Sequence, residues 1–393
     1  MKNKMMKRLS VALAASAALA AAPAGALTIN LFDVGGVTGT PAELGFTIAA
    51  KYWESVFTND AILNFAVGYA PLGPKILGST SSNLVQYVPI ADYQSALAFT
   101  GTSALDATAV ANLAPLSGTG SVKMMVASYL DPSTNSGIDA DGPGRLAPDG
   151  MEISQTIALT TANVKALVGG GANVLDGEIT FSSDFAFDFD PTNGIKTGTY
   201  DFVGVAIHEI GHALGFVSGA DDFDYSHGYT GNDVDSAWWA YGLDMFRYAK
   251  DANGDPILNV VPGDDGYFSI DGGASAYLGA YFSTGTDHGD GWQASHWKEP
   301  NVPCTNFVGI MNPYICNGVG DDVTAADLGL FDAIGWNLAD GARDNAFYKM
   351  STADIFSSLM PVPELSTWAQ MVLGFSLLGA GLRRRAKVSV RFG

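Results

Sequence analysis

The run FVGVAIHEIGHALGF, residues 202–216, is the feature that most restricts how this chain can fold. Its only polar side chains are those of His208, Glu209 and His212, and Gly215 stands near its end. An apolar run of this length predicts a buried helix from about residue 201 to residue 214, ended by the glycine. The chain must therefore build a core around this helix.

The two histidines of this helix are four residues apart, so both imidazoles project from the same face. This spacing leaves room for one metal ion between them, and zinc is the usual ion for such a pair. Glu209 follows the first histidine, at an angle from which a carboxylate can reach a metal-activated water without being a ligand. The pattern indicates metal-assisted hydrolysis rather than two unrelated histidines.

The third ligand of this site is not evident from the helix alone. A catalytic zinc normally has three protein ligands and one open position. A compact version of the pattern would place a third histidine where this chain has Ser218. The residues after the helix that could serve instead are Asp221, Asp222, His227, His288 and His296.

The helix motif, with Gly215 three residues after His212, resembles the metzincin clan of zinc peptidases. Downstream, His296 in ASHW and Met311 in GIMNP are similar to the leishmanolysin-like branch of that clan. In that branch a long insertion separates the glycine from the third histidine, and a methionine turn lies beneath the metal. The resemblance therefore implies that His296 is the third zinc ligand and that Met311 forms the methionine turn. It covers mainly residues 200–216 and 294–336.

The resemblance implies an α+β fold and a zinc endopeptidase. A twisted mixed sheet with the active-site helix would form an upper subdomain, residues 27–216, above a loop-rich lower subdomain, residues 217–345. Glu209 would act as the general base and then the general acid in the hydrolysis of a polypeptide substrate. The substrate would lie along an edge strand, for which residues 178–187 are the candidate. A non-catalytic surface or extracellular-matrix protein that keeps a structural metal site is the alternative.

The two ends of the chain have the composition of targeting segments. Residues 1–26 combine a basic start, an apolar run and small residues at the end, which is typical of a secretory signal peptide. Residues 362–393 resemble a PEP-CTERM sorting signal, with Val-Pro-Glu, a short apolar run and three arginines. We expect residues 346–361 to be a linker. The predicted location is therefore outside the inner membrane, at the cell surface or secreted, with the C-terminal segment as an anchor that engages the membrane and sorting machinery.

Charge separates the ends from the body of the chain. Nine of the 20 basic residues lie in residues 1–26 and 383–393, which leaves 11 bases against 40 acids and a formal charge of −29 in residues 27–382. Such a body repels nucleic acid and suits an extracytoplasmic domain that binds calcium. Asp251, Asn253 and Asp255 alternate like the oxygen ligands of a calcium loop, although an ordinary solvated turn is the simpler interpretation and the one we prefer.

The chain has two cysteines, Cys304 and Cys316, and no Cys-x-x-Cys pair. In an exported protein the expected state of such a pair is a disulfide that closes a short loop. Because the two residues bracket Met311, the disulfide would brace the floor of the metal site.

Overall fold

The computed structural model describes residues 27–360 with the exception of residues 172–173 and 238–239. The described part is an α+β fold with several mixed sheets. The proposed signal peptide and sorting segment lie outside the described residues. No helix within the described part of the chain is long and apolar enough to cross a membrane.

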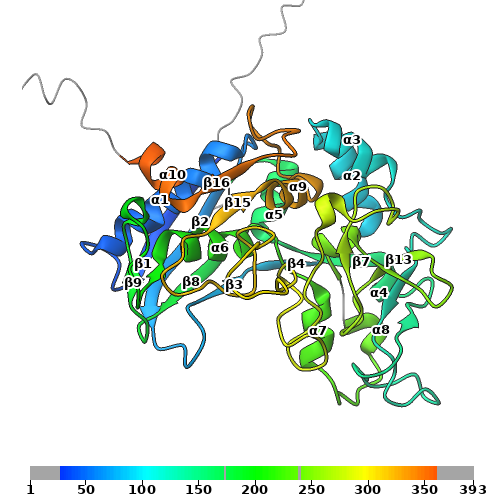
Figure 1. Cartoon of the computed structure of the whole chain (residues 1–393). Coiled ribbons are helices and arrows are strands. Elements are labelled where there is room, and N and C mark those ends of the chain that lie inside the picture. The colour runs from blue at the N-terminus through cyan, green and yellow to red at the C-terminus, as the bar shows by residue number, and fades with distance from the viewer. Residues whose placement is uncertain (1–26, 172–173, 238–239, 361–393) are drawn as a thin grey trace, which may run out of the picture.

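The first sheet carries the helix that contains His208 and His212. Its strand order is β1 (Thr28–Gly35), β2 (Ile62–Ala70), β8 (Gly177–Ser182) and β3 (Gly78–Ser82). The first three strands are parallel to one another, and β3 pairs antiparallel with β8. Helices α1 (Pro41–Val56) and α6 (Phe202–Ala213) pack against each other, and α6 also packs against β3 (Figure 1). The rings of Phe46, Phe181 and Phe202 fill the space between sheet and helices, with centroids 4.5–5.1 Å apart.

One sequence expectation about this sheet is wrong. Residues 178–187 do not form an edge strand, because β8 pairs with β2 on one side and with β3 on the other. The strand ends at Ser182, and only Phe187–Asp188 resumes as the short strand β9. The edge of the sheet beside the active-site helix is therefore β3, whose small polar residues gave no strong strand pattern.

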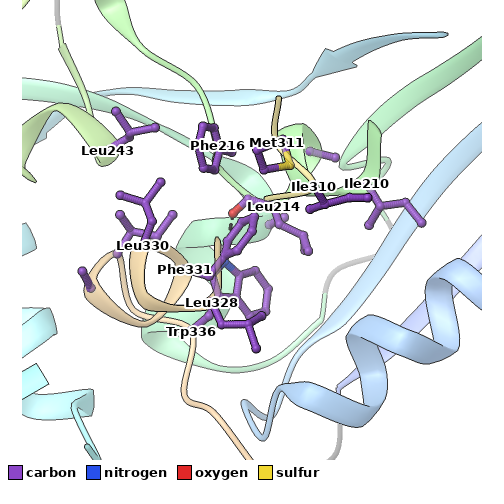
Figure 2. Close-up of a cluster of buried hydrophobic side chains, with 14 of the residues drawn as sticks. Ile210, Leu214, Phe216, Leu243, Ile310, Met311, Leu328, Leu330, Phe331 and Trp336 are labelled. Carbon is purple, nitrogen blue, oxygen red and sulfur yellow. Dashed lines mark hydrogen bonds between the residues drawn. The ribbon is translucent and has the colours of Figure 1, made fainter. Parts of the chain in front are cut away.

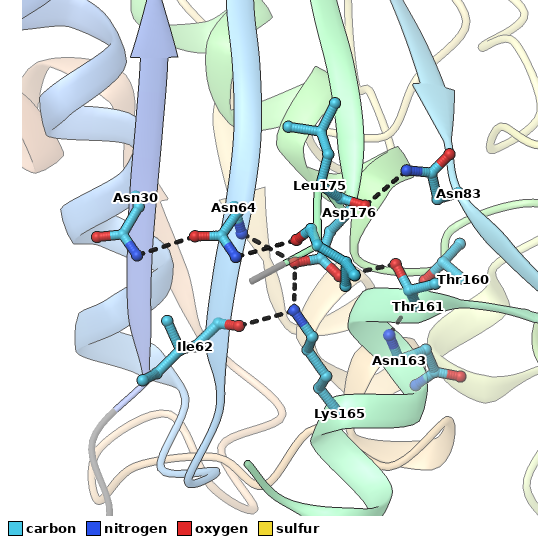
Figure 3. Close-up of polar contacts among 11 residues, drawn as sticks. Asn30, Ile62, Asn64, Asn83, Thr160, Thr161, Asn163, Lys165, Leu175 and Asp176 are labelled. Carbon is cyan, nitrogen blue, oxygen red and sulfur yellow. Dashed lines mark hydrogen bonds and ion pairs between the residues drawn. The ribbon is translucent and has the colours of Figure 1, made fainter. Parts of the chain in front are cut away.

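A buried ion pair holds this sheet to the helix α5 (Thr161–Val168). The carboxylate of Asp176, fully buried, accepts from Lys165 Nζ at 2.7 Å, from Thr161 Oγ1 at 2.7 Å and from the amide of Asn64 at 2.8 Å (Figure 3). Lys165 also donates to the carbonyl of Ile62 at 2.9 Å. Each charged atom thus has several partners, which is the condition under which a buried ion pair is tolerated.

Two further sheets have three and five strands. Strands β4 (Leu84–Pro89), β7 (Thr156–Thr160) and β11 (Ala240–Tyr241) form one. Another has the order β14 (Tyr267–Phe268), β12 (Arg247–Lys250), β13 (Pro256–Asn259), β5 (Met124–Val126) and β6 (Arg145–Leu146). Both sheets join strands from before and after residue 217, so the lower part of the molecule is built from both halves of the sequence and not from residues 217–345 alone.

The other helices surround these sheets. They are α2 (Ile90–Thr100), α3 (Ala104–Ala111), α4 (Glu152–Gln155), α7 (Gly219–Tyr225), α8 (Val234–Ala237) and α9 (Ala325–Ala333). The helix α9 begins with a capping box in which Thr324 and Asp327 each bond the other's backbone, as the sequence Thr-x-x-Asp predicts. The side chains of α9 pack with those that follow the active-site helix (Figure 2).

The predicted linker, residues 346–361, contains ordered structure. Strand β16 (Lys349–Ser351) pairs with β15 (Asp322–Thr324), and helix α10 (Thr352–Leu359) packs on α1. Ile355 and Phe356 are buried there. Two adjacent apolar residues are too few to show a helical pattern in the sequence, so the linker prediction missed this helix, and the folded body extends to residue 359.

Candidate metal centre

The active-site helix α6 is fixed at its start and along its length. Asp201 caps it, and its Oδ1 accepts from the amide of Gly204 at 3.1 Å. A cap of this kind stabilises a helix by about 1 kcal/mol. On the buried side, the indole nitrogen of Trp53 in α1 donates to the carbonyl of Ile207 at 3.2 Å. The prediction of a buried helix that ends before Gly215 is confirmed.

Three histidine side chains converge at one point. The Nε2 atoms of His208 and His212 are 3.0 Å apart, and Nε2 of His296 is 3.2 Å from each of them. Two nitrogen atoms bound to one zinc at about 2.05 Å in tetrahedral geometry lie about 3.3 Å apart. The spacing of the three nitrogens therefore fits a single zinc ion.

The other ring nitrogen of each histidine contacts a backbone carbonyl. Nδ1 of His208 donates to the carbonyl of Ile310 at 2.8 Å, and Nδ1 of His212 donates to that of Phe216 at 2.7 Å. Nδ1 of His296 lies 3.2 Å from the carbonyl of Gln293. A carbonyl can only accept, so each ring carries its proton on Nδ1 and presents a lone pair at Nε2. Three lone pairs that face one another at this distance are complementary to a cation.

Burial keeps these imidazoles neutral. It lowers the pKa of His208 to about 4, and burial together with the neighbouring His208 lowers the pKa of His212 to about 3. The pKa of His296 is lowered well below its usual value by burial and by the other two rings. Neutral imidazole is the form that binds metal.

Gly215 provides the turn that completes the partner set of His212. Its φ of +122° lies in a region that L side chains rarely adopt. The turn sets the amide of Phe216 to donate to the carbonyl of Gly211 at 3.2 Å, and it places the carbonyl of Phe216 on His212. Immediately beyond it, the amide of Ser218 donates to Ser295 Oγ at 2.9 Å. The position at which a compact motif would carry its third histidine is thus in contact with the residue before His296.

Asp221, one of the open candidates for the third ligand, positions that segment instead. Its carboxylate accepts from the amides of Ala294 at 2.6 Å and Ser295 at 2.9 Å, and also from the hydroxyl of Ser295. It is buried, and burial raises its pKa to about 6. Asp222 is bound to the hydroxyl of Tyr241 at 3.1 Å. The sequence indicated Asp221 as a candidate ligand near the site, but it did not indicate that this carboxylate holds the backbone of another segment.

Met311 lies directly beneath the helix. It is fully buried, and a Cβ on Gly211 would come within 2.6 Å of its sulfur, so the helix can sit this close only with glycine there. Figure 2 shows Met311 among Ile210, Leu214 and Phe331.

The turn that carries Met311 is held by Asp327, which also belongs to the capping box of α9. Its carboxylate accepts from the amides of Ile310 at 3.0 Å and Met311 at 3.2 Å, and from the indole of Trp297 at 2.8 Å. One buried acid therefore ties the methionine turn to the residue after His296. The Thr-x-x-Asp motif marks this acid as a cap residue, but nothing local shows that both of its oxygens also reach other segments.

Glu209 lies under the edge strand β3. Its Oε2 accepts from Thr80 Oγ1 at 2.8 Å, and its backbone carbonyl accepts from the same hydroxyl at 2.9 Å. A Cβ on Gly78 would come within 2.5 Å of Oε1, so the strand can pass here only with glycine at that position. Burial raises the pKa of Glu209 to about 7, and the Thr80 hydrogen bond opposes this shift. Such a carboxyl can both take and release a proton near neutral pH.

The predicted disulfide is confirmed. Cys304 and Cys316 are bonded, with Cα atoms 5.7 Å apart, and they close a loop that contains Met311. Its two ends lie on either side of the methionine turn, so the loop below the metal centre is covalently closed.

The calcium candidates form a hairpin turn between β12 and β13. Asp251 Oδ1 accepts from the amides of Asn253 at 2.8 Å and Asp255 at 2.9 Å. This carboxylate oxygen therefore serves the turn itself, which agrees with the simpler interpretation of the sequence.

No protein-family model matches the chain, and comparisons with curated proteins and with solved structures return no significant match. The residues of the site are therefore the only basis for a function.

Proposed function

We propose that this chain is a zinc-dependent endopeptidase of the metzincin type, in the leishmanolysin-like branch. The observation that carries the proposal is the convergence of three Nε2 atoms, 3.0–3.2 Å apart, from two segments more than eighty residues apart. A metzincin-like arrangement also accounts for Gly215, the methionine turn and the closed loop around it. His208, His212 and His296 would hold the zinc.

A zinc ion in this position supplies Lewis acidity, which lowers the pKa of a water and polarises a carbonyl. The protein must supply the proton transfers. Glu209 suits this task because its burial raises its pKa to about 7, so its Oε atoms can accept a proton from water and return it to the leaving amine. Thr80 is a positioning residue in this scheme, since its hydroxyl holds one carboxylate oxygen.

The edge strand β3 is the surface on which we propose that the polypeptide substrate lies. Its inner side pairs with β8, and it passes over the active-site helix. An extended peptide can add to such an edge through main-chain hydrogen bonds. The substrate would therefore pair with residues 78–82 and not with residues 178–187.

We also propose that the protein is exported and works at the cell surface or outside the cell, anchored by residues 362–393. The support is the composition of the two ends and the acidic body between them. The disulfide in the described part is consistent with an oxidising compartment.

Glu209→Gln tests the catalytic part of the proposal. The purified protein is assayed on a peptide library and its zinc content is measured. We expect proteolysis to fall by about 10²–10⁴-fold, the usual contribution of a general acid–base group, with zinc content unchanged. Glu178→Gln, at an exposed position of β8, is the control that should retain full activity.

The alternative, a non-catalytic surface or matrix protein with a structural metal, makes the opposite prediction. It requires that the unmodified protein cleaves no peptide at any pH or calcium concentration. That result would overturn the peptidase proposal whatever the zinc content.

A further inference from the structure

The two histidines that the metal centre does not use form a second cluster. The chain has five histidines, and three belong to the centre described above. The rings of the remaining two, His227 and His288, have centroids 4.3 Å apart. Asp141 lies beside both rings, with its Oδ1 2.7 Å from Nδ1 of His288 and its Oδ2 4.0 Å from Nε2 of His227.

The segments that bring these side chains together are far apart in the sequence and are each fixed by backbone contacts. Asp141 and His288 are 147 residues apart. The loop that carries His227 is bound to the segment before Asp141, since the amide of Gly228 donates to the carbonyl of Ile138 at 2.9 Å. The buried carboxylate of Asp224 accepts from the amides of Asp287 at 2.9 Å and His288 at 2.7 Å. The backbone is therefore held in place while the side chains remain accessible.

The charges around the cluster favour a cation. Asp139 Oδ1 lies 3.8 Å from Nδ1 of His227, which gives the cluster a second carboxylate. Among the ion pairs of the described residues, Asp139 and Asp141 pair only with the two imidazoles, and no lysine or arginine neutralises them. Two imidazoles with carboxylates suit zinc and neighbouring transition metals, whereas calcium and magnesium prefer oxygen ligands alone.

We propose that His227, His288 and Asp141 form a second binding site for a divalent transition metal, of which zinc is the representative ion. Ligand atoms of one zinc, each at about 2.1 Å, lie at most about 4.2 Å apart. The three side chains offer ligand atoms that are all within 4.8 Å of one another. The side chains of His227, His288 and Asp141 are 33%, 18% and 68% exposed, so they have room for the small rotations that close the difference.

Binding of the ion competes with the protons and hydrogen bonds that the ring nitrogens of the cluster already have. The amide of Ala140 donates to Nδ1 of His227 at 3.1 Å, so the neutral ring carries its proton on Nε2. Nδ1 of His288 donates to Asp141. A metal must displace a proton or one of these hydrogen bonds, so the affinity is lower than at the three-histidine centre. The bound ion ties together three loops that have little regular secondary structure.

The test is the zinc stoichiometry of the full chain. The protein is stripped of metal, equilibrated with a series of free Zn²⁺ concentrations and analysed for zinc per chain. We expect two ions in the unmodified protein and one in the double variant His227→Ala, His288→Ala. Asp141→Asn should weaken the second ion by at least about tenfold, since even outer partners of metal ligands contribute this much. Asp265→Asn, an exposed acid paired with Lys298, is the control.

Two results overturn the proposal. The unmodified protein binds one zinc at every concentration, or the double variant binds as many ions as the unmodified protein. If the double variant fails to fold, Asp141→Asn and a variant of the first centre, His212→Ala, decide the question, because the latter must still bind one zinc. Since the readout is zinc per chain, failure of this proposal leaves the proteolysis experiment on Glu209 unaffected.

Discussion

The two histidine clusters of this molecule differ in what their second ring nitrogens touch. At the three-histidine centre every Nδ1 contacts a backbone carbonyl, so every Nε2 is free for a metal. In the His227–His288 cluster one Nδ1 receives an amide proton and the other contacts a carboxylate. The first arrangement fixes the tautomer that binds metal, whereas the second has to be rearranged.

Burial follows the same division. His296 is 6% exposed and His208 and His212 are partly buried, whereas His227 and Asp141 are exposed, with 33% and 68% of their side chains accessible. The side chains of a buried site lose their conformational freedom during folding, whereas those of a half-exposed site lose it only when the ion binds. The comparison teaches that the contacts behind the ligands, and not only the number of histidines, decide which cluster can serve catalysis.

Loss of a ligand from the buried centre should have the largest effect. Zinc in a four-ligand structural site is bound by about 10–16 kcal/mol, so one ligand contributes roughly 3 kcal/mol, or more than about 100-fold in affinity. We expect His296→Ala to lower the affinity for zinc by at least this factor and to abolish proteolysis. Zinc titration with a competing chelator measures the change, and Asp265→Asn is the control. Retention of both properties would show that His296 is not a ligand.

Loss of a contact behind the ligands should have a smaller effect, and only at the buried centre. Asp221→Asn removes an acceptor of the amides of Ala294 and Ser295, which hold the segment that leads to His296. We expect zinc affinity to fall by about 10–100-fold with the stoichiometry unchanged. If instead Asp221→Asn abolishes the zinc and His296→Ala does not, then Asp221 is the ligand.

The packing between helix and methionine turn should have a moderate effect. A methyl group on Gly211 would come within 2.6 Å of the sulfur of Met311, and overpacking of this kind costs about 1–3 kcal/mol. Urea unfolding of Gly211→Ala measures the loss. Gly204→Ala, on the same helix, has its nearest contact at 3.2 Å and is the matched control. Equal stability of the two variants would remove the methionine turn from the list of constraints on this helix.

Mild acid should separate the two clusters without a mutation. Burial lowers the pKa of His208 to about 4 and that of His212 to about 3, so protons compete with zinc at these atoms only below about pH 5. In the second cluster a metal must displace a proton or a hydrogen bond, so its zinc is bound more weakly. Since metal binding releases protons, we expect this weaker zinc to be released first as the pH falls from about 7 to about 5, and the zinc of the three-histidine centre to remain. Simultaneous release of both ions would contradict the expected difference in zinc affinity between the two clusters.

Local patterns predicted the parts of the site that one helix or one turn contains. The apolar run and its glycine located α6, and Thr324 with Asp327 located the start of α9. His296 came from the resemblance, because a ligand more than eighty residues away leaves no local signal. The same holds for the pair His227 and His288, which the sequence offered only as separate candidates for one site.

Two other features could not be predicted because they depend on pairing and not on pattern. Which strand lies at the edge of the first sheet is decided by the partners of β8, and β3 has few apolar residues to reveal it. The positioning roles of Asp221 and Asp327 arise from hydrogen bonds to segments that are distant in sequence. An acidic residue in a sequence is a possible hydrogen-bond acceptor, but the sequence does not show which amides donate to it.

The hydrogen bond between Ser218 and Ser295 means that the chain leaves the active-site helix and returns to the same place. The excursion between these residues begins and ends at one point, so its length does not determine where His296 stands. Loops within this stretch can therefore change in length while the three histidines keep their positions, provided that Asp221 still holds Ala294 and Ser295.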